Sequence, residues 1–366
     1  MSFHTAVRNN KSSCKISVVM SVFNGEKYLA QAVESILCQT FTDFEFIIIN
    51  DGSTDNTLKI LTSYTDPRIL VVSQENRGLT ISLNKAISLA RGEYVARMDA
   101  DDLSFPQRLA AQVAELDRCK EIDLVGCFYD VIDSTGRVSK VVKLQTDPLY
   151  RLWRLQFHNI YAHGSVMMRS SELAKAGGYN GSFACAQDYD LWLRLSHASN
   201  TMVIPRVLYS FRASEGHSQI STQYRDTQAA LSMATSNDAL AAYNPTLTDN
   251  DLQEVRSLYL GRSASCFTQN GINLIRVTVK GFCAKYGISA HDEQRLTMQV
   301  VRDALYVLLL RTSVHRILYD ARSVYKLFTI FPRHLVIAIL RNAPKLLKRT
   351  FLPQKGSGIW KSDNAR

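Results

Sequence analysis

Short apolar runs alternate with amphipathic stretches over the first hundred residues, and this alternation restricts the fold more than any other feature. The runs are KISVVMSV (15–22), FEFIIIN (44–50), ILVVS (69–73) and EYVARM (93–98), whose β-branched and aromatic side chains are typical of buried strands. Helical patterns lie between them, such as the stripe of Leu29, Val33 and Ile36. This order predicts a Rossmann-like, mostly parallel central sheet flanked by helices, which is an α/β fold.

The pattern changes in the second half of the chain. IDLVGCFYDVID, STGR and VSKVVKL predict a hairpin, HGSVMMR follows, and a helix begins at DYDLWLRLS. Beyond residue 222 we expect a mainly α-helical region, with helices near 223–242, 249–269, 272–285, 290–311 and 313–331. We therefore predict an N-terminal extension (1–14), an α/β domain (15–221, with halves 15–102 and 103–221) and a helical C-terminal region (222–366).

The net charge of +10 on the 366-residue chain comes from its end. Residues 301–366 hold 13 Lys and Arg against three acidic residues, which leaves 30 basic and 30 acidic residues in the rest. A packed helix pair with a solvated cationic face would explain this charge. A basic amphipathic tail on an anionic membrane surface fits better, because apolar runs such as LFTIF and LVIAIL separate the cations. No nucleic-acid-binding motif accompanies the charge, so we expect no nucleic acid partner.

The seven cysteines are scattered and form no C-x-x-C pair, so neither a disulfide framework nor a zinc site is predicted. The first residues lack the apolar core of a secretion signal, and no segment approaches roughly 18 uncharged apolar residues. We expect a cytoplasmic protein that associates peripherally with the inner face of the cell membrane.

A polar cluster follows each of the four predicted strands. VFNGE follows the first, NDGSTD the second, QENRG the third and DADD the fourth. Ligands of parallel sheets bind beyond the carboxyl ends of the strands. We therefore expect these loops to share one rim, which bears Asn24, Asp51, Arg77, Asp99 and Asp101.

DADD places Asp99, Asp101 and Asp102 within four positions, where like charges repel. A divalent cation explains Asp99 and Asp101, because Mg²⁺ and Mn²⁺ prefer one or two carboxylates together with diphosphate oxygens. Asp102, or Ser104, has the simpler interpretation of capping a helix that begins near Pro106.

Two other acidic motifs have a structural and a functional interpretation each. In NDGSTD, Asp51 either belongs to a strand-to-helix turn or accepts hydrogen bonds from a nucleotide. In AQDYDLWLRL, Asp188 and Asp190 either complement the helix dipole or provide a base that takes a proton from an attacking hydroxyl. Neither G-x-G-x-x-G nor G-x-x-x-x-G-K-[ST] occurs, which argues against a dinucleotide fold and a P-loop.

Taken in order, these motifs resemble the family 2 glycosyltransferases, which have the GT-A fold. The likeness covers roughly residues 14–220 and includes SVVMSVFNGEKYLAQAVESILCQTFTDFEFIIINDGSTDNT, NRGL, GEYVARMDADD, HGSVMMR and QDYDLWLRL. The resemblance implies transfer of one sugar from a nucleotide diphosphate donor, with inversion at the anomeric carbon. Residues 15–102 would bind the nucleotide sugar, and residues 103–221 would bind the acceptor.

The resemblance also implies roles for residues on the donor side. Asp51 would bind the nucleobase, helped by Ser21, Asn24 and Arg77. Asp101 would ligate the Mn²⁺ or Mg²⁺ that bridges the diphosphate.

Other matching positions concern the ribose, the base and the diphosphate. Asp99 would face the ribose or a metal-bound water. Asp188 matches the catalytic base, whereas Asp190 would cap or pack. Arg212 and His217 resemble the pair that closes over the diphosphate; His217 would be a metal ligand, a phosphate contact or an unrelated loop histidine.

The chain departs from the family pattern in two places. Gln187 stands where many relatives carry Glu, and no Q-x-x-R-W motif follows, which argues against a processive polymerase. His163 would line the acceptor side or serve the structure. We expect a UDP-hexose donor and a polyprenyl-diphosphate-linked saccharide acceptor of surface polysaccharide assembly. The alternative is a non-catalytic nucleotide-sugar or sugar-binding module that has kept the fold.

Overall fold

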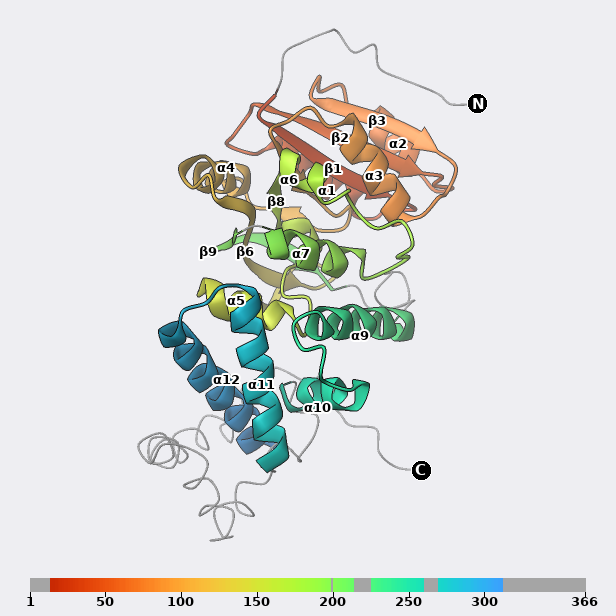
Figure 1. The fold of residues 1–366 in the computed structure, drawn as a ribbon. Helices are drawn as coiled ribbons and strands as arrows, with labels where there is room; N and C mark the ends of the chain where they lie inside the picture. The colour runs from red at the N-terminus through yellow and green to blue at the C-terminus, as the bar shows by residue number, and fades with distance from the viewer. Residues whose placement is uncertain (1–13, 199, 214–224, 260–268, 312–366) are drawn as a thin grey trace, which may run out of the picture. The chain divides into compact units, whose positions relative to one another are not determined.

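The structure is a computed structural model that describes residues 14–198, 200–213, 225–259 and 269–311. The chain divides into two compact units, residues 1–242 and 243–366 (Figure 1). His217 and the helix predicted at 313–331 lie outside the described residues. The predicted functional boundary at residue 221 stays a prediction.

The four predicted strands of the first half are confirmed within one or two residues. They are β1 (Ile16–Val22), β2 (Phe44–Asp51), β3 (Ile69–Gln74) and β4 (Tyr94–Arg97). All three pairings among them are parallel, in the order β3-β2-β1-β4. The connecting helices are α1 (Leu29–Leu37), α2 (Thr57–Thr62) and α3 (Leu79–Leu89). The polar loops therefore do emerge at one edge of the sheet, as predicted.

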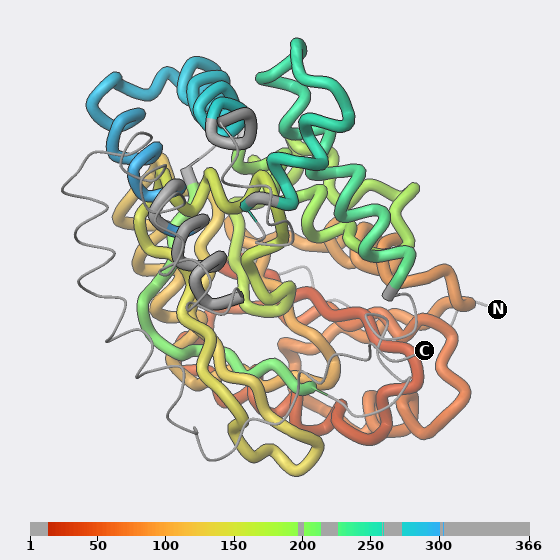
Figure 2. The backbone as a smooth tube through the Cα atoms, turned by 90° about the horizontal axis from the view of Figure 1, so that it is seen from below, coloured from red at the N-terminus to blue at the C-terminus, as the bar shows by residue number. Residues whose placement is uncertain are grey.

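The second half extends this sheet with mixed pairing, in the order β4-β8-β6-β9-β5 with β7 beside β6. Its strands are β5 (Leu103–Ser104), β6 (Ile122–Ile132), β7 (Val138–Val142), β8 (Met167–Arg169) and β9 (Asn200–Arg212). β8 pairs antiparallel with both β4 and β6, so β6 runs in the same direction as β4. The predicted hairpin is β6 and β7, and it appears in yellow in Figure 2.

Helices of the second half complete the unit. They are α4 (Arg108–Arg118), α5 (Pro148–Leu155), the single 3₁₀ turn η1 (His163–Ser165), α6 (Ser170–Lys175), α7 (Gln187–Ala198) and α9 (Arg225–Ala241). The other unit contains α10 (Asp249–Tyr259), α11 (Gln269–Lys285) and α12 (Ala290–Arg311). Among the described helices, none is long and apolar enough to cross a bilayer.

The sheet separates two apolar cores. Side chains of α1, α2 and α4 pack against one face, where they meet Val18, Met20 and Phe46. Side chains of α3, α6 and α7 pack against the other face, where they meet Val19 and Ile47. Alternate residues of each strand enter opposite cores, as the pleat requires. The sheet is therefore covered on both faces, and its carboxyl edge carries the loops.

Candidate active site

Hydrogen bonds join the first two loops of the rim. The Asn24 amide nitrogen donates to Ser53 Oγ at 3.0 Å, and Asn24 Oδ1 accepts from the Thr54 amide at 2.8 Å. Asn24 adopts a positive φ of 51°, a conformation that Asn tolerates better than most residues. Ser21, at the end of β1, is half-buried beside Ile49 of β2. The structure thus brings Asn24 to the loop that follows Asp51 and places Ser21 beside the end of β2.

Asp51 fastens the third loop to the second. Its side chain is 2% exposed, and its two oxygens accept hydrogen bonds from the Gln74 side chain at 2.7 Å and from the backbone of Arg77 at 2.9 Å and of Gly78 at 2.8 Å. Gly52 lies so close to the third loop that an added Cβ would come within 2.6 Å of the Asn76 nitrogen. Asp51 therefore has an evident structural role, and its contact with a nucleobase stays a prediction. The Arg77 side chain is exposed at the same rim.

Asp99 is neutralised by a neighbour in the same motif. Arg97 Nη2 donates to Asp99 Oδ1 at 2.6 Å, and the Arg97 side chain is fully buried whereas that of Asp99 is 25% exposed. Arg97 Nε also donates to His163 Nε2 at 3.3 Å. Because one oxygen of Asp99 is engaged by an internal cation, the demand of a bound metal for negative charge falls more heavily on Asp101.

Carboxylate oxygens at Asp99 and Asp101 fit the oxygen preference of Mg²⁺ and Mn²⁺. The described residues contain no group of three or more His, Cys, Asp and Glu side chains able to hold a metal ion. Asp99 and Asp101 would hold a cation together with oxygens of the donor, which is the usual arrangement for Mg²⁺ at nucleotide phosphates. The metal role of both residues stays a prediction.

Asp102 does not cap a helix, and that prediction was wrong. Helix α4 begins at Arg108 after Gln107, without a side-chain cap. The Asp102 carboxylate is instead 1% exposed and accepts hydrogen bonds from the Arg212 amide at 2.7 Å and from Tyr209 Oη at 2.7 Å. Burial and the neighbouring acids, Asp101 first, raise its pKa well above the ordinary value. Asp102 therefore anchors the DADD loop to β9.

Arg212 strengthens the same attachment. Its guanidinium is 1% exposed and donates to the Asp101 carbonyl at 2.7 Å, the Asp133 carbonyl at 3.1 Å and the Gln31 side chain at 2.9 Å. It also lies over the ring of Tyr28, 4.3 Å from the centroid. These contacts give Arg212 a structural role in holding the loop, while its predicted contact with a diphosphate stays untested.

Gly164 explains the glycine of the HGSVMMR motif. A Cβ at this position would lie 1.7 Å from Tyr209 Oη and 2.9 Å from Asp99 Oδ2. The 3₁₀ turn that contains Gly164 therefore packs directly beneath the DADD loop. The Gly164 carbonyl also accepts a hydrogen bond from the buried Arg108. Any larger side chain would push the turn away from Asp99.

Asp188 lies in the first turn of α7 and is held by two hydrogen bonds. Asn159 Nδ2 donates to Oδ2 at 2.6 Å, and the Tyr189 amide donates to Oδ1 at 2.8 Å. The pKa of Asp188 is raised to about 6, because burial outweighs these two donors and Asp99 adds repulsion. A partly exposed carboxylate with this pKa is suited to accept a proton near neutral pH.

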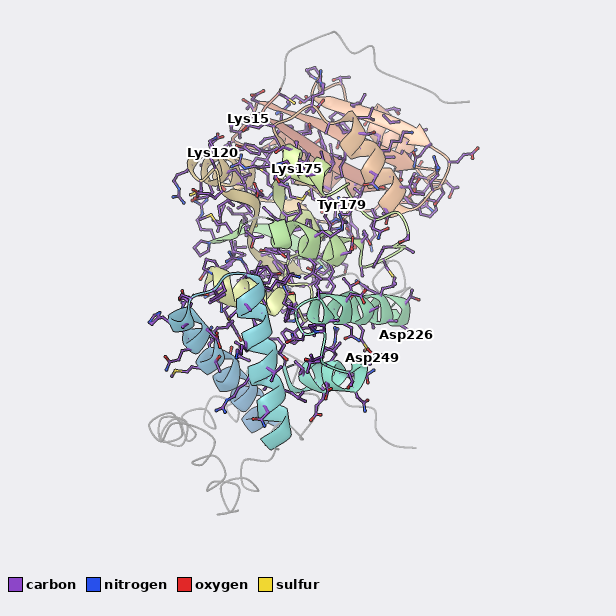
Figure 3. The ribbon with its side chains drawn as sticks, viewed as in Figure 1. Lys15, Lys120, Lys175, Tyr179, Asp226 and Asp249 are labelled. Carbon is purple, nitrogen blue, oxygen red and sulfur yellow. The ribbon has the colours of Figure 1, made fainter. Side chains whose placement is uncertain are left out.

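A neutral histidine, His163, and a tyrosine, Tyr179, contact each other beside Arg97. His163 Nε2 is 2.8 Å from Tyr179 Oη, and Tyr179 lies on the segment between α6 and α7 (Figure 3). Burial and the charge of Arg97 lower the pKa of His163 well below its ordinary value. His163 thus has structural partners. Asp190 pairs with Arg194 of the same helix at 2.6 Å, which agrees with the predicted packing role.

Sequence reasoning missed several residues of this site. Four of them contact a predicted site residue or its neighbour: Arg97, Asn159, Tyr179 and Tyr209. Each of these contacts joins positions that are distant in the chain, except the pair of Arg97 and Asp99. Only Arg97 carried a usable signal, because an arginine at the end of an apolar strand, two residues before an aspartate, suggests an internal ion pair.

The arrangement of a parallel sheet, acidic loops at its carboxyl edge and a carboxylate at a helix terminus defines a class of group-transfer enzymes, the GT-A glycosyltransferases. Among solved structures, S. aureus TarS 1–349 in complex with UDP-GlcNAc has a TM-score of 0.55 at 18% identity, covering 82% of this chain and 91% of that chain. At this identity the likeness shows the fold alone.

Comparison of sequences gives the family. A model described as Glycosyl transferase family 2 matches residues 17–173. The putative glycosyltransferase EpsE of Bacillus subtilis (strain 168) is 38% identical over 190 residues, which is 50% of this chain and 67% of the relative. The O-antigen biosynthesis glycosyltransferase WbnJ of Escherichia coli is 36% identical over 184 residues, which is 49% of this chain and 71% of the relative. The chain belongs to glycosyl transferase family 2.

Proposed function

We propose that this glycosyltransferase moves a single hexose from a UDP-sugar to a saccharide acceptor and inverts the anomeric carbon. The observation that carries the proposal is Asp188, a held carboxylate whose pKa of about 6 is raised partly by Asp99 of the donor motif. In-line sugar transfer requires a base for the acceptor hydroxyl and stabilisation of the charge on the leaving diphosphate. Asp188 and the DADD loop are the candidates for these two roles.

The donor would lie along the rim formed by the first four loops. Arg77 is exposed there, and Ser21 and Asn24 lie at the adjoining loops. UDP is favoured because TarS, which shares the fold, was solved with UDP-GlcNAc. The donor diphosphate would face Asp101 and the Asp99 side chain, which is 25% exposed. A divalent cation held there would offset the negative charge that develops on the leaving diphosphate.

Asp188 would act on the acceptor. As the acceptor oxygen forms its bond to the anomeric carbon, the bond from that carbon to the diphosphate breaks and the leaving group takes the electron pair. The proton of the acceptor hydroxyl passes to a carboxylate oxygen of Asp188, which keeps a lone pair beyond the one used by Asn159 or Tyr189. Attack from the face opposite the diphosphate gives inversion.

A screen of nucleotide sugars by thermal stabilisation tests the donor. With Mn²⁺ present, UDP-glucose, UDP-galactose, UDP-GlcNAc and GDP-mannose are compared by melting temperature, since a ligand that binds the folded state raises it. We expect one UDP-sugar to raise the melting temperature, EDTA to reverse the rise, and Asp101→Ala to abolish it. Equal melting temperatures with and without every donor would contradict the proposal.

The acceptor would be a polyprenyl-diphosphate-linked intermediate of a surface polysaccharide. WbnJ is described as an O-antigen biosynthesis enzyme, and the 13 basic residues of 301–366 suit an anionic membrane surface on which such an acceptor would lie. Flotation with phosphatidylglycerol vesicles tests this step. We expect the full chain to float with the vesicles and a chain ending at residue 300 to stay in the soluble fraction. If both chains stayed in the soluble fraction, the tail would be excluded as an anchor.

A further inference from the structure

Asp130 of β6 is a buried carboxylate whose burial has no local explanation. Its side chain is 6% exposed, and its Oδ1 has no hydrogen-bond partner. Burying a polar oxygen without a hydrogen-bond partner is costly, and a buried unsatisfied group calls for a reason. Asp123 on the same strand is different, because Arg169 Nε lies 3.3 Å from its Oδ1. The same strand thus offers one paired and one unsatisfied aspartate.

Asp130 lies on the side of the sheet that carries the candidate base. Leu124 and Phe128 of β6 contribute to the core beneath α3 and α7, whereas Tyr129 packs in the opposite core. Successive residues of a strand alternate between faces, so Asp130 follows Phe128 on the α7 side. Asp188 begins α7.

The path from Asp188 to Asp130 runs along β6. The ring of Tyr161 lies over Gly126 of β6, because a Cβ added to Gly126 would come within 2.7 Å of that ring. Asn159, two residues before Tyr161, donates a hydrogen bond to Asp188. Asp130 is four residues farther along the strand, a distance of about 13 Å. Because β6 runs parallel to β4 and continues beyond it, Asp130 lies past the carboxyl end of β4, at the edge of the sheet that carries the acidic loops.

Two exposed valines lie beside this carboxylate. Val141 of β7 pairs with Asp130, and Val138 pairs with Ile132. The pairing of β6 with β7 shifts by one residue between these two pairs, which leaves Ser139 as the extra residue. Val138 and Val141 therefore both lie on the face of the hairpin that carries Asp130 and Ile132. Val138 is 50% exposed and Val141 49% exposed. The hairpin therefore combines an unsatisfied acceptor with two exposed apolar side chains. Its backbone is yellow in Figure 2.

We propose that Asp130, Val138 and Val141 form a subsite for the acceptor saccharide. Asp130 accepts hydrogen bonds from hydroxyls of a neutral sugar residue that precedes the attacked one, and the apolar face of that ring packs on the valines. Saccharides combine hydroxyl donors with C–H faces, and sites for small molecules place a few polar groups in an apolar surface. The subsite rests on the proposed function and extends it to the acceptor.

The first test compares Asp130→Asn with Asp123→Asn in thermal melting at neutral pH without ligands. We expect Asp130→Asn to raise the melting temperature by about 2–4 °C, because the Asn amide can turn a donor toward the position where the carboxylate oxygen has no partner. Asp123→Asn, which removes a paired charge, should lower it. A decrease for Asp130→Asn would mean that the carboxylate already has a stabilising partner, and would overturn the subsite.

The second test measures transfer to the p-nitrophenyl glycosides of three disaccharides, cellobiose, lactose and chitobiose, in which one sugar residue precedes the terminal, attacked one. Asp130→Asn should raise the KM for the accepted glycoside about tenfold or more, and Val138→Ser/Val141→Ser should raise it as well. Hydrolysis of the donor without acceptor should be unchanged in both variants. Unchanged KM values, or a wild type that turns over donor yet accepts no glycoside, would overturn the subsite.

Failure of the proposed function would look different. In that case the wild type would release no nucleotide from any donor, with or without glycoside, and the subsite would fall with it. Donor turnover with equal KM values for wild type and Asp130→Asn would instead remove the subsite alone.

Discussion

Arg97 donates a 2.6 Å hydrogen bond to Asp99, and its guanidinium is fully buried behind the DADD loop. The first acid of the motif therefore carries its own counterion before any ligand binds. The pair separates the two acids, since Asp99 is fixed in place by Arg97, whereas Asp101 is the acid that we propose meets the cation.

Replacing Arg97 tests how far the loop depends on this pair. Arg97→Met should lower the free energy of unfolding by about 3–5 kcal/mol, because Asp99 loses its buried counterion. Urea denaturation measures the change. Arg77→Met, at an exposed position of the same rim, is the control and should stay within about 0.5 kcal/mol of wild type. Equal stabilities of the two variants would show that the pair contributes nothing.

The neighbouring acids Asp101 and Asp102 should respond oppositely to substitution. Asp101→Asn should abolish the stabilisation by donor and Mn²⁺. Asp102→Asn should retain it, because an amide oxygen still accepts from Arg212 and the Tyr209 hydroxyl can rotate to accept. Melting curves with and without the ligands decide between them, and loss of metal-dependent stabilisation in a folded Asp102→Asn would contradict these roles.

Replacing Asp102 by Ala should destabilise the protein, whereas replacing it by Asn should not. Asp102→Ala leaves the Arg212 amide and the Tyr209 hydroxyl without their buried acceptor, so the free energy of unfolding should fall by about 2–4 kcal/mol. The comparison with Asp102→Asn in urea separates the hydrogen bonds from the charge. An alanine variant as stable as wild type would remove the anchoring role.

The raised pKa of Asp188 predicts that the activity of the enzyme falls at acid pH. Below a pH of about 6 the carboxyl group is protonated, so kcat/KM should fall about tenfold per pH unit. Asn159→Leu removes a donor that favours the ionised form and should move this fall to higher pH. A profile that is flat between pH 5 and 8 in wild type would exclude Asp188 as the titrating base.

The same pKa shift affects stability with a definite sign. The folded protein raises the pKa of Asp188 from 3.8 to about 6, so the folded state binds the proton more tightly than the unfolded state. The stabilisation from protonation is full below about pH 4 and is lost as the pH rises through about 6. Asp188→Asn should therefore melt higher than wild type at pH 7, and this difference should shrink at pH 4.

Gly164 should tolerate no side chain. Gly164→Ala would place a methyl group against Tyr209 and Asp99, and we expect a loss of about 3 kcal/mol together with weakened donor binding. Gly181→Ala is the matched control, because nothing lies within 4 Å of an added Cβ there. Equal melting temperatures of the two variants would show that the 3₁₀ turn moves freely.

Local patterns made the first half of the fold predictable. β1, β2 and β4 are buried on both faces and β3, at the sheet edge, is half-buried, so each appears in the sequence as a short, mainly apolar run. The parallel order places the following polar loops at one edge. The strand β8, with three residues, and the pairing of β9 with β6 have no comparable signal. They depend on contacts between distant segments.

The site was predictable only where its residues stand in motifs. Asp51, Asp99, Asp101 and Asp188 follow strands or begin helices, which is a local feature. The partners that fix them are not local: Asn159 reaches Asp188 across 29 positions, and Tyr209 reaches Asp102 across 107. The wrong assignment of Asp102 as a helix cap has this origin, because its partners lie on a strand that the motif does not reveal.

The most direct test of the account is nucleotide release by Asp188→Asn with the UDP-sugar that stabilises the wild type. The account predicts that this variant binds donor and Mn²⁺ as the wild type does, with the same rise in melting temperature, but transfers sugar about 10²–10⁴ times more slowly. A variant that binds the donor and transfers sugar at the wild-type rate would contradict it.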